Sequence, residues 1–415
     1  MSDEFDVVII GAGAAGIGAA RSLAGHGLRL LLVDAQDRIG GRACSLRLGR
    51  IAVDMGCGYL HSAERNRWVA IGRQLGFTID QGDPGWRDQY RNLGFSAADQ
   101  HEAMLAFEDF TARLRADPPA SDRAGDALLP DGRWNAYIEA LSGYINGAGF
   151  DRVSAADYLA YDDAASELNW RVREGYGSLI AAAMPASVEA RFELPVTRID
   201  HGAAMLALDT DQGTIRAHRA IVTVPTPVLA SGALAFDPPL PAKQEAAAAL
   251  PLGHAEKIFL ALGQPDMLPR DGHLLGNPHS VRTGSYQLRP MGYPLVEGFF
   301  GGKAACELER LGPADAAAFA IDELAALLGN DIRAHLHLLG GSAWGRTRWI
   351  EGGYSHALPG MADRRAVLAE PVDDRIFFAG EACSTADFST AHGALDTGLA
   401  AARSVLASLR GRLAA

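Results

Sequence analysis

The feature that most restricts the fold of this chain is a glycine-rich turn between an apolar run and a helical pattern. Residues 5–10 (FDVVII) are typical of a buried parallel strand, and GAGAAG follows directly at residues 11–16. The Ala- and Leu-rich stretch 14–26 predicts a helix, and residues 28–33 predict a second strand that ends at Asp34. This order is typical of a βαβ unit that binds a dinucleotide.

Each glycine of the turn has a separate mechanical task. Gly11 allows the tight turn, Gly13 lets the backbone approach a pyrophosphate, and Gly16 lets the helix lie against the sheet. The helix N-terminus offers N–H groups and partial positive charge to phosphates, and Asp34 can accept a hydrogen bond from a ribose hydroxyl. A turn without a ligand is the alternative, which the complete order disfavours. The predicted contacts are Gly11, Gly13, Ala14, Ala15, Gly16, Asp34 and Ala35.

The residues after the acid indicate which dinucleotide binds. Residues 38–42 read RIGGR, and R-x-G-G-R at this place resembles the FAD-dependent amine oxidase superfamily. The most similar members are polyamine oxidases and the catalytic domains of flavin-type lysine demethylases. The resemblance implies that Gly40 and Gly41 bring the backbone under the flavin side of FAD. It also implies that Arg38 and Arg42 supply positive charge around the pyrophosphate; a basic surface turn is the alternative.

Other segments share this resemblance along nearly the whole chain. Residues 54–56 resemble the end of the first flavin-binding segment, 195–199 the strand that meets adenine, and 221–225 the I-V-T-V-P strand. Residues 380–381 (GE) resemble the second contact to the phosphate and ribityl groups, and 390–394 (TAHGA) resemble the helix start that points at the flavin. The resemblance therefore adds these cofactor contacts: Gly56, Cys57, Gly58, Tyr59, Val196, Pro225, Trp344, Gly353, Gly380, Glu381, Thr390, Ala391, His392 and Ala394.

Lys257 closes a P-L-G-x-x-x-K motif and begins an apolar run that reads as a strand. A lysine in such a strand is unusual on propensity alone. In the family that the motif resembles, this lysine faces flavin N5 and holds a water molecule. The alternative is a lysine at a sheet edge in solvent. The full motif favours a catalytic role.

The segment from Trp344 to Tyr354 resembles the aromatic-cage segment of the family. The resemblance implies that Tyr354 stands perpendicular to the flavin and guides the amine, since a ring face attracts a cation, and that Trp349 lines the same cavity. Core packing is the alternative for both. Gly353 stands where monoamine oxidases carry the cysteine that bonds to flavin, so the FAD is expected to dissociate. Thr390 stands where they place a second cage tyrosine, which favours a longer or bulkier amine.

His61 closes a Tyr-Leu-His step that resembles the W-I-H of polyamine oxidases. Two roles are equally expected for His61: a polar group near the substrate amine, or a hydrogen-bonded structural histidine. Residues 65–165 then read as a helical insertion, with Ser154 as an expected N-cap. The insertion carries no recognisable motif and is expected to form one wall of the substrate cavity.

Composition limits the compartment and the partners. The 415 residues are 48% hydrophobic, with 38 basic and 50 acidic residues and a net charge of −12, so nucleic acid is not an expected partner. The four cysteines lack C-x-x-C spacing, which predicts free thiols and no metal site. Without a basic leader, a tail anchor or a membrane-length apolar stretch, we expect a cytoplasmic monomer or homodimer.

The sequence therefore predicts an α/β, two-domain flavoprotein. A discontinuous, Rossmann-type FAD-binding domain takes residues 1–60, 170–250 and 340–415. A mixed α+β substrate domain with a helical insertion takes residues 61–169 and 251–339.

The expected reaction is FAD-dependent oxidation of a polyamine-like or bulky primary or secondary amine. It proceeds by hydride transfer to flavin N5, followed by imine hydrolysis and reduction of O₂ to H₂O₂. The expected catalytic residues are Lys257, Tyr354, Trp349, His61 and Thr390. A flavin dehydrogenase or desaturase acting on a non-amine substrate, and a catalytically silent flavoprotein, are the alternatives.

Overall fold

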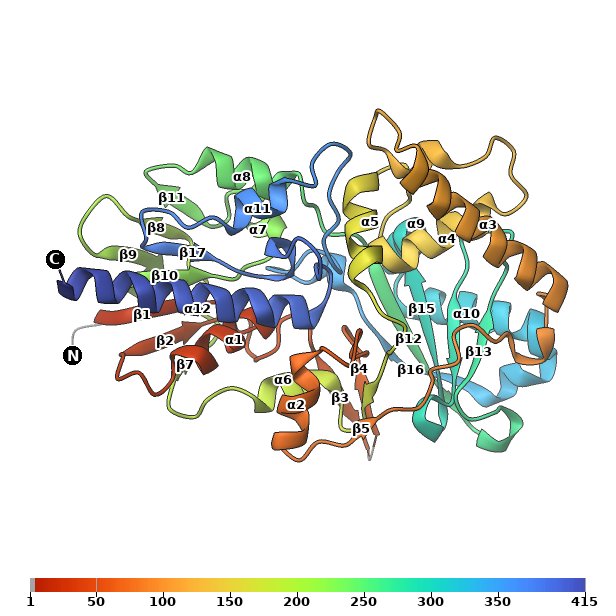
Figure 1. Ribbon diagram of the computed structural model, residues 1–415. Helices are drawn as coiled ribbons and strands as arrows, with labels where there is room; N and C mark the ends of the chain where they lie inside the picture. The colour runs from red at the N-terminus through yellow and green to blue at the C-terminus, as the bar shows by residue number, and fades with distance from the viewer. Residues whose placement is uncertain (1–3, 50, 415) are drawn as a thin grey trace.

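Two β-sheets with helices packed against them organise the chain (Figure 1). The computed structural model describes residues 4–49 and 51–414, so expectations about residues 1–3, 50 and 415 lie outside the described residues. The eight-stranded sheet lies at one end of the molecule, where both chain ends are also found, and the five-stranded sheet lies at the other end. This architecture confirms the predicted fold class.

The eight-stranded sheet is built around the predicted βαβ unit. Its order is β11-β8-β9-β10-β1-β2-β7, and β17 pairs with β10 in parallel. Along β1, Val7 and Ile9 face one core while Val8 and Ile10 face the other, as expected for a strand buried on both sides. The strands are β1 (Glu4–Ile10), β2 (Leu30–Val33), β7 (Glu189–Arg191), β8 (Arg198–Asp200), β9 (Leu206–Thr210), β10 (Gly213–Val222), β11 (Ala235–Asp237) and β17 (Ile376–Phe378).

Helices cover both faces of this sheet. On one face, α1 (Ala14–Leu23) packs along α12 (Ala391–Ala414), with α2 (Arg67–Gln74) and α6 (Tyr176–Ala182) nearby. The other face carries α7 (Thr226–Ala230), α8 (Pro241–Ala248) and α11 (Arg364–Ala369). The first helix was predicted to run to His26, which is wrong, because the chain leaves the helix at Leu23 and both Gly25 and Gly27 take positive φ.

The five-stranded sheet has one apolar and one partly polar face. Its order is β13-β14-β15-β12-β16, and α9 (Gly302–Leu311) and α10 (Pro313–Leu328) pack against the apolar face. Its strands are β12 (Ala255–Leu262), β13 (Gly272–Leu275), β14 (Ser285–Leu288), β15 (Leu295–Gly301) and β16 (Leu336–Gly341). The strand pairing places His273, Gln287 and Glu297 in one row across the opposite face, to which Lys257 also belongs.

Three helices of the predicted insertion lie beside this sheet, whereas α2, also within residues 65–165, packs against the eight-stranded sheet. The three helices are α3 (Ala97–Ala116), α4 (Asn135–Asn146) and α5 (Ala155–Ala164), and the Ser154 hydroxyl caps α5 by accepting from Asp157 N, as predicted. Two small sheets lie between the large ones: β3 (Ser45–Leu48) with β4 (Ile51–Asp54), and β5 (Ile79–Asp80) with β6 (Arg171–Val172). No helix within residues 4–49 and 51–414 combines the length and the apolar character that a bilayer crossing requires.

A buried ion pair joins the insertion to the far side of the eight-stranded sheet. Asp157 on α5 accepts two bonds from Arg365 on α11, of 2.6 and 2.8 Å, and both residues are at most 2% exposed. We expect Asp157→Asn to lower the free energy of unfolding by about 3–5 kcal/mol, because it leaves a buried guanidinium without its counter-ion. Chemical denaturation measures this change.

The matched control for that prediction is Asp162→Asn on the same helix. Asp162 pairs with Arg115 in solvent, where such a pair contributes at most about 1 kcal/mol. Equal losses of stability in the two variants would contradict the prediction.

Candidate functional site

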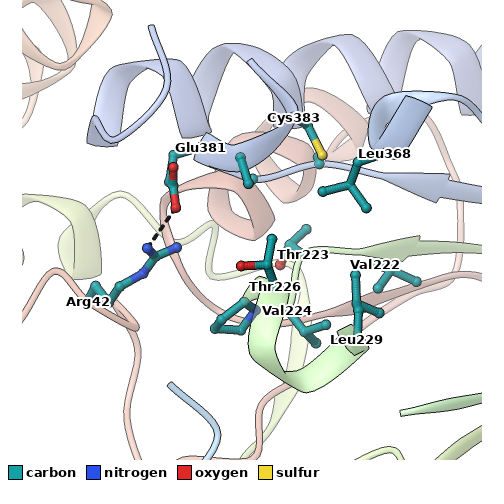
Figure 2. Close-up of a pocket in the computed structure, with 13 residues that line it drawn as sticks. Arg42, Val222, Thr223, Val224, Thr226, Leu229, Leu368, Glu381 and Cys383 are labelled. Atoms are coloured by element: carbon teal, nitrogen blue, oxygen red, sulfur yellow. Dashed lines mark hydrogen bonds and ion pairs between the residues drawn. The ribbon is translucent and has the colours of Figure 1, made fainter. Parts of the chain in front are cut away.

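The carboxyl ends of four parallel strands meet at one edge of the eight-stranded sheet. β17, β10, β1 and β2 are neighbours there, and they are followed by Ala379, Thr223, Gly11 and Asp34. Open α/β sheets bind their ligands in the crevice at this edge. A cavity lies at this edge, between Thr223 and Glu381 (Figure 2). Its volume is about 20 Å³, which gives room for about one water molecule.

The predicted glycine turn is closely packed at Gly16, while the space beside Gly13 is open. A Cβ on Gly16 would lie 1.8 Å from the carbonyl oxygen of Gly11, so only glycine lets α1 approach the strand this closely. A Cβ on Gly13 would meet only the carbonyl oxygen of Gly40, at 3.9 Å. Gly13 and Gly40 also form an isolated parallel bridge, which brings the two predicted glycine segments together. The backbone of Gly13 is thus accessible to a bulky anion.

Polar groups around this turn suit the phosphate and ribose parts of a dinucleotide. Asp34 accepts hydrogen bonds from Ala12 N (2.6 Å) and Gln36 N (2.7 Å). These bonds lower the pKa of its carboxyl group, but burial has the larger effect and raises it. Each carboxylate oxygen keeps a second lone pair for a hydroxyl donor. Arg38 Nη1 is buried without a hydrogen-bond partner, which is costly unless an anion pairs with it. These residues therefore fit FAD.

Arg42 and Glu381 link the flavin-binding motifs to the segment that carries Tyr354. Arg42 Nη1 donates to Glu381 Oε1 at 2.8 Å (Figure 2). It also donates to the Gly353 carbonyl at 2.8 Å. Glu381 Oε2 also accepts from the Ser355 hydroxyl at 2.6 Å. Burial acts to raise the pKa of Glu381, but the charge of Arg42 and these bonds outweigh it and lower the pKa. Glu381 is thus held as a carboxylate.

The loop after β4 is held against both sheets. A Cβ on Gly56 would lie 1.8 Å from the Arg42 carbonyl oxygen, and one on Gly58 would lie 3.0 Å from Lys257 Nζ. Trp344 is 6% exposed and its indole donates to the Met55 carbonyl at 3.0 Å. Trp344 therefore supports this loop from the core.

Lys257 lies on a central strand, not at a sheet edge, and is 6% exposed. Its ammonium group contacts Glu297 Oε1 at 2.8 Å and donates to the Asp54 carbonyl at 3.0 Å. The solvent-exposed alternative for this lysine is therefore wrong. Sequence reasoning missed Glu297, although a single acid within the apolar run 295–301 was an available signal.

Tyr354 is hydrogen-bonded to the segment just before β12, the strand of Lys257, and to the insertion. Its carbonyl accepts from Gly253 N at 2.8 Å, and its hydroxyl donates to the Tyr144 carbonyl on α4. Burial raises the pKa of its phenol far above the usual value, so the hydroxyl stays protonated. The residue before it, Gly353, lies against Ala255, two positions before the lysine. The structure thus brings the Lys257 and Tyr354 segments together.

The structure shows the contacts of two further predicted catalytic residues, Trp349 and Thr390. Trp349 packs against the core of the eight-stranded sheet, and among the described residues its ring makes no aromatic contact with Tyr354. The Thr390 hydroxyl donates to the Asp387 carbonyl at 2.6 Å and accepts from Gly393 N at 3.0 Å. Thr390 therefore caps the start of α12.

His61 belongs to a cluster of partly buried rings with Tyr59 and Trp86. The Tyr59 and Trp86 ring centroids are 4.5 Å apart, and His61 Nδ1 lies 2.6 Å from Asn169 Oδ1. Burial lowers the pKa of His61 to about 4, against the raising effect of Asn169, so its ring is neutral at pH 7. Trp86 and Asn169 were not predicted, because neither belongs to a motif.

Other predicted contacts lie at the cavity, in the core and at the start of α12. Pro225 lines the cavity of Figure 2 together with Gly380, and Val196 is buried in the core on one face of the eight-stranded sheet. At the start of α12, the Ala391 carbonyl accepts from the Trp68 indole, and His392 Nε2 lies 3.2 Å from Asp387 Oδ1. Ala394 is buried against α1. The described part of the chain holds four free cysteines and no group of three metal-ligating side chains.

His273, on the polar face of the five-stranded sheet, provides a test of burial in this region. It is 6% exposed, and burial lowers its pKa from 6.5 to about 4. As pH falls, His273 therefore binds a proton in the unfolded chain before it does so in the folded protein. The free energy of unfolding falls by about 3 kcal/mol between pH 6.5 and 4 for this reason. We expect His273→Gln to remove this part of the pH slope in denaturation experiments.

Ser285→Ala is the control for the slope. It removes the hydrogen-bond partner of His273 at 2.9 Å but leaves the ionisable ring, so the slope should persist. An unchanged slope in His273→Gln would refute the assignment.

Comparison with known proteins places the chain in a family. Residues 86–406 match the family described as flavin containing amine oxidoreductase, and residues 9–75 match the NAD(P)-binding Rossmann-like domain. Polyamine oxidase 2 of Arabidopsis thaliana is 28% identical over 432 residues, which cover 95% of this chain and 87% of that protein.

Lysine-specific histone demethylase 1 homolog 2 of Oryza sativa subsp. japonica is 27% identical over 453 residues, which cover 98% of this chain. The chain spans only 58% of the length of that relative, and 53% of homolog 1 from the same plant. The solved structure of cyclohexylamine oxidase from Brevibacterium oxydans superposes with a TM-score of 0.81 at 22% identity. It covers 98% of this chain and 99% of that one, which supports the fold. Since the family match covers most of its length, the chain belongs to the flavin containing amine oxidoreductases.

Proposed function

We propose that this protein oxidises the carbon–nitrogen bond of a polyamine-like amine, or of a bulky primary or secondary amine. The product is an imine that water hydrolyses to a carbonyl compound and an amine, or ammonia where the substrate is a primary amine oxidised at its own nitrogen, while O₂ is reduced to H₂O₂. When bound, FAD supplies the two-electron redox chemistry of this reaction. We further propose the residue ranges given above for the FAD-binding and substrate domains.

The chain's own residues hold the reactants in place in this proposal. The turn at Gly13, the start of α1 and Arg38 bind the pyrophosphate, and Glu381 binds the hydroxyl groups of the ribityl chain. The Tyr354 ring orients the amine, because a ring face attracts a cation and also fits an apolar amine substituent. Lys257 holds a water molecule with the N–H group that its two protein acceptors leave over.

One observation supports this proposal most strongly. Gly353, the residue before Tyr354, lies against Ala255, two positions before Lys257. Arg42 donates to the Gly353 carbonyl, and its own carbonyl lies against Gly56 of the loop that reaches Lys257. A buried cation and an aromatic residue thus share one region with two of the predicted FAD motifs.

A peroxide-coupled screen tests the function. The FAD-loaded protein is assayed with polyamines, monoamines, amino acids and an N-methyl-lysine peptide; relatives named polyamine oxidase and lysine-specific demethylase motivate the first and last of these. We expect peroxide with at least one bulky or long amine. Flavin reduction by a non-amine compound, with no amine active, would instead identify a dehydrogenase or desaturase.

The FAD is proposed to be bound without a covalent bond. Gly353 has no thiol with which a flavin could react. We therefore expect acid precipitation to release all of the yellow colour into the supernatant. Flavin that stays with the protein pellet would contradict this prediction.

A further inference from the structure

The ammonium group of Lys257 is held from two sides by protein acceptors. Glu297 Oε1 lies 2.8 Å from Nζ, and the Asp54 carbonyl oxygen lies 3.0 Å from it. The side chains are only 7% and 15% exposed for Lys257 and Glu297, so solvent screens this pair little. An ammonium group has three donors, so the Asp54 carbonyl and the paired Glu297 carboxylate leave at least one of them for another partner.

The position of Glu297 follows from the register of two neighbouring strands. On β12 and β15, Lys257 lies opposite Phe299 and Phe259 lies opposite Glu297. Lys257 and Glu297 are therefore diagonal neighbours on the same face of the sheet, within reach of a long side chain. The strand pairing itself thus places the carboxylate beside the ammonium group.

The second acceptor is equally well fixed. The Asp54 carboxylate accepts from Tyr176 N at 2.9 Å and from Gly177 N at 3.1 Å, at the start of α6. It also accepts from the Ser45 hydroxyl at 2.5 Å. These three bonds fix the backbone of Asp54, so its carbonyl oxygen is a rigid acceptor for Lys257.

We propose that Glu297 is a positioning residue for the oxidation reaction. Its carboxylate pairs with the Lys257 ammonium group and holds it against the Asp54 carbonyl, so that a remaining N–H group has a fixed direction. This inference rests on the proposed function, in which Lys257 holds a water molecule at the redox centre. The competing role for an acid here is direct binding of a second positive charge on the substrate.

A double-mutant cycle separates the two roles. If Glu297 acts through Lys257, Glu297→Gln should slow flavin reduction or reoxidation about tenfold, because it removes the negative charge beside Lys257 but keeps the length of the side chain. The same change in a Lys257→Met background should then have less than about a twofold further effect. Stopped-flow measurement of both half-reactions on the FAD-loaded proteins gives these rates. An undiminished effect of Glu297→Gln in the Lys257→Met background would overturn the inference and assign Glu297 to the substrate.

A second measurement does not depend on activity. The sequence contains three lysines, Lys243, Lys257 and Lys303, so acetylation can be followed at each by peptide mass spectrometry. Lys257 should be protected relative to the exposed Lys303 and should react about tenfold faster in Glu297→Gln. Glu297→Asp keeps the charge and should fall between the two proteins in both assays. Equal labelling of wild type and Glu297→Gln would overturn the inference.

The failures of the two proposals are distinguishable. Normal turnover by Lys257→Met would remove the proposed role of Lys257, and the inference with it. A slow Lys257→Met protein beside a normal Glu297→Gln protein would overturn the inference alone. Retained FAD content in each variant verifies that the fold is intact.

Discussion

Replacing Lys257 with methionine is expected to slow amine oxidation or flavin reoxidation by about 100-fold, the effect of losing one preorganised electrostatic donor. Methionine has a similar length but no charge and no N–H group, so it cannot hold a water molecule or offset negative charge. FAD should stay bound, because the lysine contacts Asp54 and Glu297 and not the proposed phosphate-binding turn. Stopped-flow spectroscopy of the anaerobic and aerobic half-reactions measures the change.

Lys303→Met is the matched control for this experiment. Lys303 lies on α9 and is exposed, so its loss should leave both half-reactions unchanged. Unchanged rates in Lys257→Met would reject the proposed role of the buried lysine.

Gly13→Val is expected to lower the affinity for FAD by at least about 100-fold while the protein remains folded. The backbone of Gly13 is extended (φ −76°, ψ −175°), a conformation that valine adopts without strain. The new side chain meets no protein atom closer than the Gly40 carbonyl oxygen, so it should fill the space that the pyrophosphate needs. Fluorescence titration of the apoprotein with FAD measures the affinity, and circular dichroism checks the fold.

Gly202→Val provides the comparison. Gly202 is exposed, and a Cβ there would have Asp200 Oδ1 as its nearest neighbour, at 3.5 Å. This variant should bind FAD as wild type does. Full FAD occupancy in Gly13→Val would mean that the cofactor does not lie over this turn.

Local patterns predicted the parts of the fold whose contacts are close in sequence. The βαβ unit and the Ser154 cap each depend on one continuous stretch of the sequence. The end of the first helix was wrong, because an Ala-rich pattern does not show where glycines at positive φ take over. The glycines after Leu23 set the end of this helix, whereas its hydrophobic pattern predicts only that a helix is present.

The candidate site was predictable only where a motif carried it. Lys257 and Tyr354 belong to recognisable segments, but Glu297 is 40 positions from the lysine and reaches it through strand register. Asn169 is 108 positions from His61, its hydrogen-bond partner. Such pairs depend on how separate elements are placed in space, which the pattern of a single segment does not contain. The packing of Trp349 against the core of the eight-stranded sheet likewise depends on spatial placement that its own segment does not reveal.

The order of strands in the larger sheet also bears on how the protein is made. β1 is the first strand of the described chain, but its neighbour β10 also pairs with β17 at residues 376–378. The first helix, α1, packs against α12, which is later still in the sequence. The five-stranded sheet, by contrast, comes from the single stretch 255–341. During synthesis the N-terminal glycine turn must therefore wait for α12, and the apolar strands beside it need protection from aggregation until that helix has been made.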